Sequence, residues 1–532
     1  MSSLKNDEVK LEVYRLYVNE GRSIADIVRL TGIPKTTISD FVNRKSQTAW
    51  WETYKDKPIA GGTKISPEFK RKELNSKRVV FTSAQNNTFV FEGFLRSLEK
   101  YCEHNGADLV VGTFTYNKSG FQNLEKDEGE WYDPKIVEYI DSTSASMQDK
   151  VVWCGELNIL PTAVNPLSGL GTYTKTLSGV VPHPKVRMDS CARPKNQTPK
   201  FMYSTGAITQ ANYIQRKEGQ KAEFHHTFGA LVVEFDEDGD WFARQLLADP
   251  DGSFYDLNTK YTPTQVELDA GLGFAEAIQW GDLHSEKPSE EVYEGSFGGS
   301  GSILDTLKPK YQFCHDTLDF TTRNHHNIKD IHFRMKSQIN SRDRVEDDLG
   351  KAAKVFKKMD RSFCKTVVVE SNHDLALLKW LNTADIRYDN IYNVHFYHKC
   401  QVKIIEAIMS KDDSFSIFRS CVDDVYPDLD LTFLKEDDSF VICEDIECAN
   451  HGHLGVNGAR GSGVSFAKMG NKQNLGHAHS AQIIEGVYVA GIAGNLEQGY
   501  NKGPSSWSNS HVLTYKNGKR TMITMSGSKW RA

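Results

Sequence analysis

Hydrophobic positions recur at helical spacing in three short segments between residues 8 and 45. Ser23 stands where a helix cap is expected, Gly32 interrupts the pattern, and Pro34 opens the last segment, a position that suits the first turn of a helix. The apolar positions are Leu11, Val13, Leu16 and Tyr17, then Ile24, Ile27 and Val28, then Ile38, Phe41 and Val42. This order predicts a helix-turn-helix-like helical domain over residues 1–54.

A helix-turn-helix unit lays its second helix in the major groove of DNA. In this chain that helix would present five polar side chains, Lys35, Thr36, Thr37, Ser39 and Asn43. An oligomerisation or packing module of the same shape is the alternative. Residues 55–77 end in FKRKELNSK, which is typical of a basic linker or of a stretch that contacts phosphates.

Residues 78–265 alternate between strand-like and helix-like segments. RVVFTSAQNN and ADLVVGTFTY read as strands on either side of an amphipathic helix, FEGFLRSLEKYCEHNG, which predicts a βαβ unit. Further strand-like pieces follow, separated by Gly, Pro and Asp turns. No catalytic signature appears there, so we expect an α/β accessory region packed on, or contributing to, a catalytic domain over residues 266–532.

The composition narrows the class of protein. With 64 Lys and Arg against 70 Asp and Glu, the net charge is −6, so any contact with nucleic acid must come from local patches. No apolar run is long enough for a bilayer, and the N-terminal segment lacks the pattern of a secretion signal. Nine scattered cysteines without a C-x-x-C pair indicate neither a disulfide framework nor a zinc finger. We therefore expect a cytoplasmic protein without a membrane partner.

The chemistry-bearing residues of the C-terminal half stand where predicted strands end. The segments AEAIQW, YQFC, KTVVVE and SFVICE are strand-like, and each is followed by Asp, Asn or His. The residues in question are Asp282 and His284, then Asp316, then Asn372, His373 and Asp374, then His451 and His453, and finally His477 and His479. In open α/β sheets the loops leaving the carboxyl ends of strands converge, so these side chains are expected to gather. A second D-x-H, Asp330-Ile331-His332, reads as a chance occurrence.

In order along residues 270–500, GDLH, HDTLD, SNHD, NHGH and GHAH resemble the motifs of the calcineurin-like metallophosphoesterases, which are D-x-H, G-D-x-x-D, G-N-H-[DE], a lone His and G-H-x-H. His315 and Ser371 replace two glycines of that pattern. Both are backbone positions and not ligands, so the departures concern loop geometry more than metal binding. The resemblance implies an α/β fold, a calcineurin-like β-sandwich flanked by helices (αββα), beside the helix-turn-helix unit and the additional α/β region.

Carried over residue by residue, the resemblance implies a two-metal site. Asp282, His284 and His479 would bind one metal, Asn372, His451 and His477 the other, and Asp316 would bridge them. His451 is preferred to His453 as the ligand. His373 resembles the family's transition-state histidine, and Asp374 would orient its ring. These are the predicted catalytic residues.

Hydrolysis of an anionic phosphodiester needs a strong nucleophile and local neutralisation of charge, which two divalent ions supply together. Imidazole, carboxylate and amide ligands in one site favour Mn²⁺, with Fe, Zn, Ni and Mg as alternatives. Nearby arginines, Arg323 among them, are candidates for contacts with phosphate oxygens.

The helix-turn-helix unit and the basic linker point to DNA as the substrate and partner, which predicts a metal-dependent DNase. The layout of the whole chain resembles that of tailed-phage DNases made early in infection, which degrade host DNA and assist transfer of the phage genome, so the host cytoplasm is the expected location. A homo-oligomer or a phage partner protein is also expected. Two alternatives stay open: a phosphatase or a cyclic or small-molecule phosphodiesterase of the same superfamily, and a DNA-binding regulator with a vestigial phosphoesterase fold.

Overall fold

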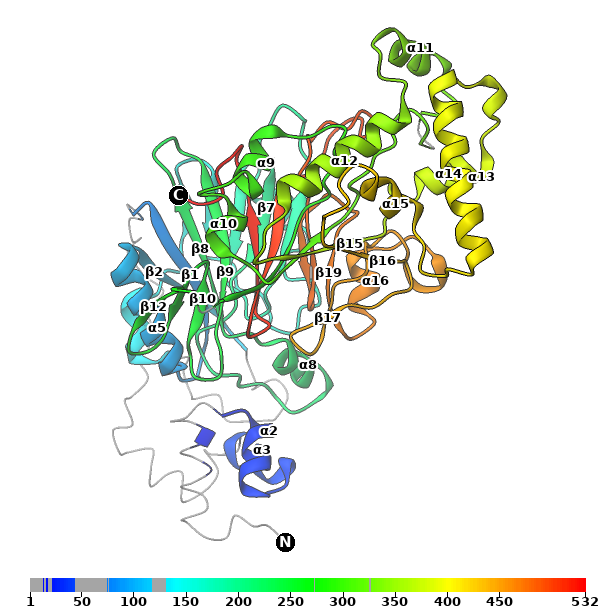
Figure 1. Cartoon of the computed structure of the whole chain (residues 1–532). Helices are drawn as coiled ribbons and strands as arrows, with labels where there is room; N and C mark the ends of the chain where they lie inside the picture. The colour runs from blue at the N-terminus through cyan, green and yellow to red at the C-terminus, as the bar shows by residue number, and fades with distance from the viewer. Residues whose placement is uncertain are drawn as a thin grey trace, which may run out of the picture. The chain divides into compact units, whose positions relative to one another are not determined.

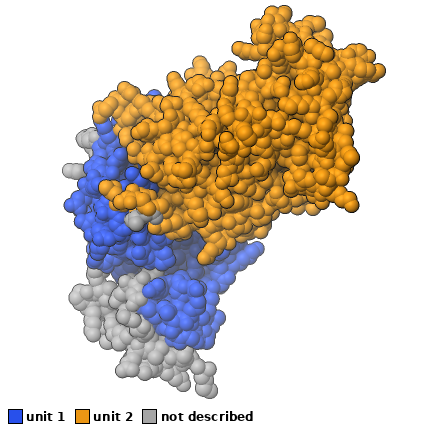
Figure 2. Space-filling view, viewed as in Figure 1, with its two compact units in different colours: residues 1–187, 202–234, 245–267 blue, residues 188–201, 235–244, 268–532 orange. Residues whose placement is uncertain are grey.

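The structure, a computed structural model, describes residues 13, 16–17, 22–43, 74, 76–116, 131–271, 273–324 and 327–532. The chain divides into two compact units, which Figure 2 colours separately. The first comprises residues 1–187, 202–234 and 245–267, and the second comprises residues 188–201, 235–244 and 268–532. The division after residue 267 lies beside the predicted boundary at 265/266, but two segments of the predicted accessory region belong to the second unit. The predicted linker lies almost entirely outside the described residues.

The helix pair near the N-terminus is present. Helices α2 (Ile24–Thr31) and α3 (Lys35–Asn43) flank Gly32, whose φ of 68° gives the left-handed conformation that ends α2. The Ser23 side chain accepts a hydrogen bond from the Asp26 N–H and caps α2. Apolar side chains from both helices form one small core, which includes Ile24, Ile27, Ile33, Ile38 and Val42. The first of the three predicted helical segments, which carries Leu11, Val13, Leu16 and Tyr17, lies mostly outside the described residues.

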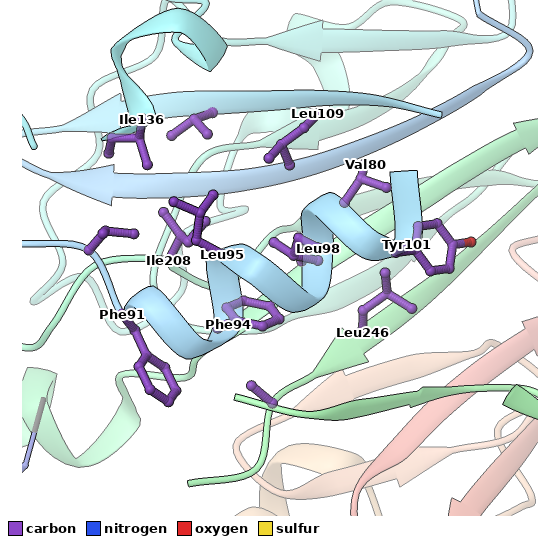
Figure 3. Close-up of a cluster of buried hydrophobic side chains, with 14 of the residues drawn as sticks. Val80, Phe91, Phe94, Leu95, Leu98, Tyr101, Leu109, Ile136, Ile208 and Leu246 are labelled. Atoms are coloured by element: carbon purple, nitrogen blue, oxygen red, sulfur yellow. The ribbon is translucent and has the colours of Figure 1, made fainter. Parts of the chain in front are cut away.

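The main core of the first unit forms where α5 (Glu92–Asn105) packs on a sheet of β1 (Arg78–Gln85), β2 (Asp108–Phe114) and β8 (Gly229–Phe235). Strands β1 and β2 are parallel, as the predicted βαβ unit requires, and β8 pairs antiparallel with β1. Figure 3 shows the buried face of α5, with Phe94, Leu95 and Leu98 turned toward these strands. This side of the helix is apolar at every third or fourth position, which is why it is buried.

The rest of the first unit consists of short elements. They are η3 (Pro134–Tyr139), β3 (Ser144–Met147), β4 (Val151–Cys154), α7 (Leu170–Tyr173), β5 (Ser178–Val181), β7 (Lys200–Ser204), α8 (Lys217–His225), β10 (Phe254–Asp256), β11 (Thr259–Tyr261) and β12 (Val266–Leu268). Strands β3, β4, β5 and β7 lie side by side in that order, and β10, β11 and β12 form a small sheet. Strands β7 and β9 (Trp241–Leu247) begin in the second unit and end in the first, whereas β8 and β12 each end with one residue in the second unit.

The second unit is built on two sheets. The first has the order β16-β15-β14-β13-β22-β23, and its strands β13 to β16 are parallel. Its strands are β13 (Ala275–Gln279), β14 (Tyr311–Cys314), β15 (Lys365–Val369), β16 (Leu431–Leu434), β22 (Ser510–Tyr515) and β23 (Arg520–Thr524). The second sheet contributes β17 (Val441–Ile442), β18 (Ile446–Glu447), β19 (Lys472–Leu475), β21 (Val487–Val489), β20 (Gln482–Ile484) and β6 (Met188–Cys191), in that order.

The two sheets of the second unit share one apolar core. Ala277, Phe313 and Val367 from the first sheet pack with Ile442 and Ile446 from the second, so the sheets face each other as a sandwich. Helices cover both outer faces. On the first sheet, α9 (Glu290–Phe297) contacts β22 through a hydrogen bond between Ser296 and His511, and α10 (Ile303–Leu307) packs on α9. Helices α12 (Val345–Met359) and α15 (Ile417–Asp423) contact β16, where Phe356 and Phe418 meet Phe433. On the second sheet lies α16 (Gly463–Ala467). Figure 1 shows α12 running across the first sheet. The chain is therefore a mixed α/β protein.

Three further helices of this unit lie outside the sandwich. Figure 1 shows α11 (Ile331–Ile339), α13 (Ala376–Thr383) and α14 (Ile391–Ser410) gathered at one end of the second unit. They belong to the connections that follow β14 and β15. Within the described residues, none of the helices is both long and apolar enough to cross a membrane.

Candidate metal centre

The loops that follow five strands of the sandwich meet at one edge. β13, β14 and β15 are parallel neighbours in the first sheet, and β18 and β19 are parallel neighbours in the second. The loops are joined by backbone hydrogen bonds: the His284 N–H donates to the Asp316 carbonyl at 2.8 Å, and the Gly476 N–H donates to the His451 carbonyl at 2.8 Å. The predicted convergence of motif residues therefore occurs, because parallel strands deliver their following loops to the same edge.

Asp282, His284, Asp316 and His479 form a buried cluster whose potential ligand atoms lie within 4.8 Å of one another. Asp282 Oδ2 lies 2.9 Å from His479 Nε2, and His284 Nε2 lies 3.1 Å from His479 Nε2. Asp282 Oδ2 also accepts a hydrogen bond from the His477 backbone N–H at 2.8 Å. This cluster holds the three residues predicted for one metal, together with the predicted bridging aspartate.

Asp316, His451 and His477 form a second cluster of the same kind. Asp316 Oδ2 lies 3.4 Å from His451 Nε2 and 4.0 Å from His479 Nε2, so this carboxylate stands between the two clusters. His453 points elsewhere, since its Nε2 pairs with Glu436 Oε1 at 2.8 Å. This geometry agrees with the preference for His451 over His453.

Several buried polar atoms at this edge have no hydrogen-bond partner among the described residues. They include Asp282 Oδ1, both carboxylate oxygens of Asp316, and Asn372 Oδ1. Buried carboxylate and amide oxygens without a partner carry a large desolvation cost, which a bound cation removes. The buried imidazole and carboxylate groups of these clusters could therefore hold a metal ion, and Asp316 belongs to both of them.

The backbone is strained at these positions. His284, Asp316, His477 and His479 have φ values of 50°, 43°, 68° and 55°, in the left-handed region that side chains with a Cβ rarely adopt. Strain of this kind costs about 1–3 kcal/mol per residue and concentrates at binding and catalytic sites. Four of the seven predicted ligands share this feature.

His373, the predicted transition-state residue, lies beside the clusters. Its Nδ1 is 3.2 Å from Asp319 Oδ1, and the same oxygen lies 2.6 Å from His284 Nδ1. Asp319 is thus the carboxylate that faces Nδ1 of His373. Asp374 accepts hydrogen bonds from the Leu318 N–H and the Ser371 hydroxyl. Its role in orienting the His373 ring stays a prediction.

The charges of the centre set the protonation of its histidines. Burial alone would lower the pKa of His373, but the negative charges of Asp316 and Asp319 outweigh burial and raise that pKa to about 10. Burial dominates at His477 and lowers its pKa to about 4. Burial and the charge of Asp316 raise the pKa of Asp374 to about 7. In the metal-free centre these shifts favour a protonated His373 and a neutral His477 at neutral pH.

Three other sequence features have structural explanations. The second D-x-H is a helix cap, since Asp330 accepts a hydrogen bond from the Phe333 N–H at the start of α11, which agrees with a chance occurrence. Arg323 is buried and paired with Asp343 and Asp389, so the suggestion that it contacts phosphate is wrong. His315 lies at the centre itself, with its Nδ1 3.3 Å from His451 Nδ1.

The motifs did not identify two aromatic residues beside the centre. Both lie on the loop between β21 and β22, where the Trp507 ring meets His479 edge-on at 4.2 Å and the Tyr500 ring lies 6.1 Å from that of His373. Asp319 was also missed, although it is the second aspartate of HDTLD. The aspartate could have been found from the spacing of the motif, whereas no local pattern marks the two aromatic rings.

The predicted DNA-contacting residues are only partly accessible. Lys35 and Thr36 are exposed at the start of α3, and Thr37 is half-buried. Ser39 is only 6% exposed, which disagrees with its predicted contact with DNA. Asn43 is the last residue of α3, and its side chain lies outside the described part of the structure.

The chain is similar to "Protein A1" of Escherichia phage T5, with 44% identity over 489 residues that cover 90% of this chain and 87% of that protein. No protein-family model matches the chain, and no solved structure matches it. The similarity is too long to be confined to either compact unit, and it supports a phage origin for the chain.

Proposed function

We propose that the chain, which belongs to the family of Protein A1 of phage T5, is a metal-dependent DNA nuclease that hydrolyses phosphodiester bonds at a dinuclear centre. One observation carries the proposal: carboxylate, amide and imidazole groups from five loops meet at one edge of a sandwich, and several of their buried oxygens lack partners. The sandwich with helices on both outer faces supports a calcineurin-like fold.

The residues of the centre would have separate roles in metal binding and proton transfer. Asp282, His284 and His479 would hold one divalent ion, Asn372, His451 and His477 the other, and Asp316 would bridge them. Two bound divalent ions supply a hydroxide nucleophile near neutral pH and neutralise the charge of the phosphodiester. His373 donates its proton toward the phosphoryl or leaving-group oxygen, and Asp319 keeps the imidazole ring in place. Mn²⁺ is the first choice of metal, because imidazoles and carboxylates share the site.

DNA is the substrate that the rest of the chain favours. Helices α2 and α3 form the predicted pair, with Lys35 and Thr36 exposed at the start of α3, where a recognition helix contacts DNA. Together with the family relationship, this supports a phage enzyme that degrades host DNA in the host cytoplasm. A phosphatase or a small-molecule phosphodiesterase would need no such helix pair.

The test is to incubate the purified full chain with supercoiled and linear DNA, with Mn²⁺ and with a chelator. We expect cleavage that requires Mn²⁺ and that is lost in Asp316→Ala. Asp330→Ala is the matched control, because it removes the aspartate of the other D-x-H and should cleave DNA at the wild-type rate. Cleavage by Asp316→Ala, or hydrolysis of phosphomonoesters without any cleavage of DNA, would refute the nuclease assignment.

A further inference from the structure

Three side chains form a line that leads away from the metal centre behind His451. His315 follows β14, and Gln279 is the last residue of β13; both are completely buried. His451 Nδ1 lies 3.3 Å from His315 Nδ1, and His315 Nε2 contacts the side-chain amide of Gln279. The line therefore runs from Gln279 through His315 to His451.

The ligand role of His451 determines the direction of these hydrogen bonds. His451 Nε2 faces Asp316 at 3.4 Å, so Nε2 is the nitrogen that would bind the metal, and it needs a free lone pair. The proton of the neutral ring must then be on Nδ1, which can only donate it to His315 Nδ1. His315 must accept with Nδ1 and carry its own proton on Nε2.

The proton on His315 Nε2 needs an acceptor, and Gln279 can supply one. Gln279 Oε1 is buried and has no other hydrogen-bond partner among the described residues. The oxygen and nitrogen of a side-chain amide are distinguished only by their hydrogen bonds. With the amide turned so that Oε1 meets His315 Nε2, each hydrogen bond along the line has one donor and one acceptor.

We propose that His315 is a positioning residue which, with Gln279, holds His451 in the tautomer that offers Nε2 to the second metal ion. This inference rests on the proposed metal centre. The calcineurin-like motif has a glycine at this position. In this chain His315 stands there, and its side chain would support a metal ligand. Partners behind a ligating histidine typically raise metal affinity by about 10–100-fold.

The experiment is calorimetric titration of Mn²⁺ into the metal-free full chain, with the melting temperature and DNA cleavage measured on the same samples. Two variants of nearly equal size separate a hydrogen-bonding role from a packing role. His315→Leu has no acceptor, whereas His315→Asn places an amide oxygen where Nδ1 was. Gln279→Leu removes the far end of the line. His183→Leu is the matched control, because His183 is a completely buried histidine of the first unit with two backbone hydrogen bonds of its own.

We expect His315→Leu to lower Mn²⁺ affinity about 10–100-fold at one of two sites and to leave the other unchanged. His315→Asn should recover most of this loss, Gln279→Leu should reproduce part of it, and His183→Leu should bind both ions like the wild type. Wild-type affinity in His315→Leu, or equal losses at both sites in the Leu and Asn variants, would overturn the inference while leaving the nuclease proposal standing. Failure of the wild-type chain to bind Mn²⁺ would overturn both.

Discussion

Gly476 lies where any side chain would enter the metal centre. A Cβ built on this residue would be 2.4 Å from Asp282 Oδ1 and 3.3 Å from His451 Nδ1. Because non-bonded carbon–oxygen contacts rarely fall below about 3.3 Å, Gly476→Ala must move the Asp282 carboxylate or its own loop by about 0.9 Å. The glycine is needed here for space, since its φ is not in the left-handed region.

The Asp282 carboxylate cannot move freely to make room for the added methyl group. Its Oδ2 is held by the His477 backbone N–H and by His479 Nε2, and its own backbone N–H donates to the Gly491 carbonyl. A displacement of about 1 Å in a catalytic group can lower the rate about 100-fold. Overpacking of this kind also costs about 1–3 kcal/mol in the free energy of unfolding. We therefore expect Gly476→Ala to fold, to bind Mn²⁺ more weakly and to cleave DNA about 100-fold more slowly.

The assay pairs a Mn²⁺ titration with the initial rate of DNA cleavage at saturating metal. Gly350→Ala in α12 is the control, because its added methyl group meets no atom within 4 Å. Alanine also favours a helix interior over glycine by about 1 kcal/mol, so this variant should be at least as stable as the wild type and fully active. The reasoning fails if Gly476→Ala binds Mn²⁺ and cleaves DNA like the wild type.

Three further predictions follow from the centre and its surroundings. Asp316→Ala and His373→Ala should each abolish hydrolysis with little change in circular dichroism, and turnover at the wild-type rate by either variant would contradict their roles. Mn²⁺ should raise the melting temperature and a chelator should reverse the rise, because the ion binds only the folded centre; an unchanged melting temperature would argue against the site. Burial lowers the pKa of His183 to about 4, so the folded state binds fewer protons than the unfolded state, and stability falls as the pH drops from about 6.5 to 4. In urea titrations His183→Gln should lose about 3 kcal/mol less over this range than the wild type, and equal losses would show that this histidine is not responsible.

The sequence by itself determined which loops hold the Asp, Asn and His side chains of the candidate metal centre. Apolar segments of strand length, each followed by Asp, Asn or His, predicted the residues that meet at one edge of the second unit. This succeeded because the side-chain pattern of a buried strand is local, and because parallel strands send their following loops to the same edge. The helix pair at residues 24–43 was likewise predictable from a cap, a glycine and helical spacing.

Only the tertiary structure decided which side chains face each other across those loops. It placed Asp319 beside Nδ1 of His373, buried Ser39, and brought Trp507 to His479. It also placed His315, which stands where the calcineurin-like motif has a glycine, behind His451. The physical reason is that these contacts depend on the direction of each side chain at a loop with an unusual backbone conformation, and the partners are far apart in sequence. Spacing along the chain carries no information about such directions.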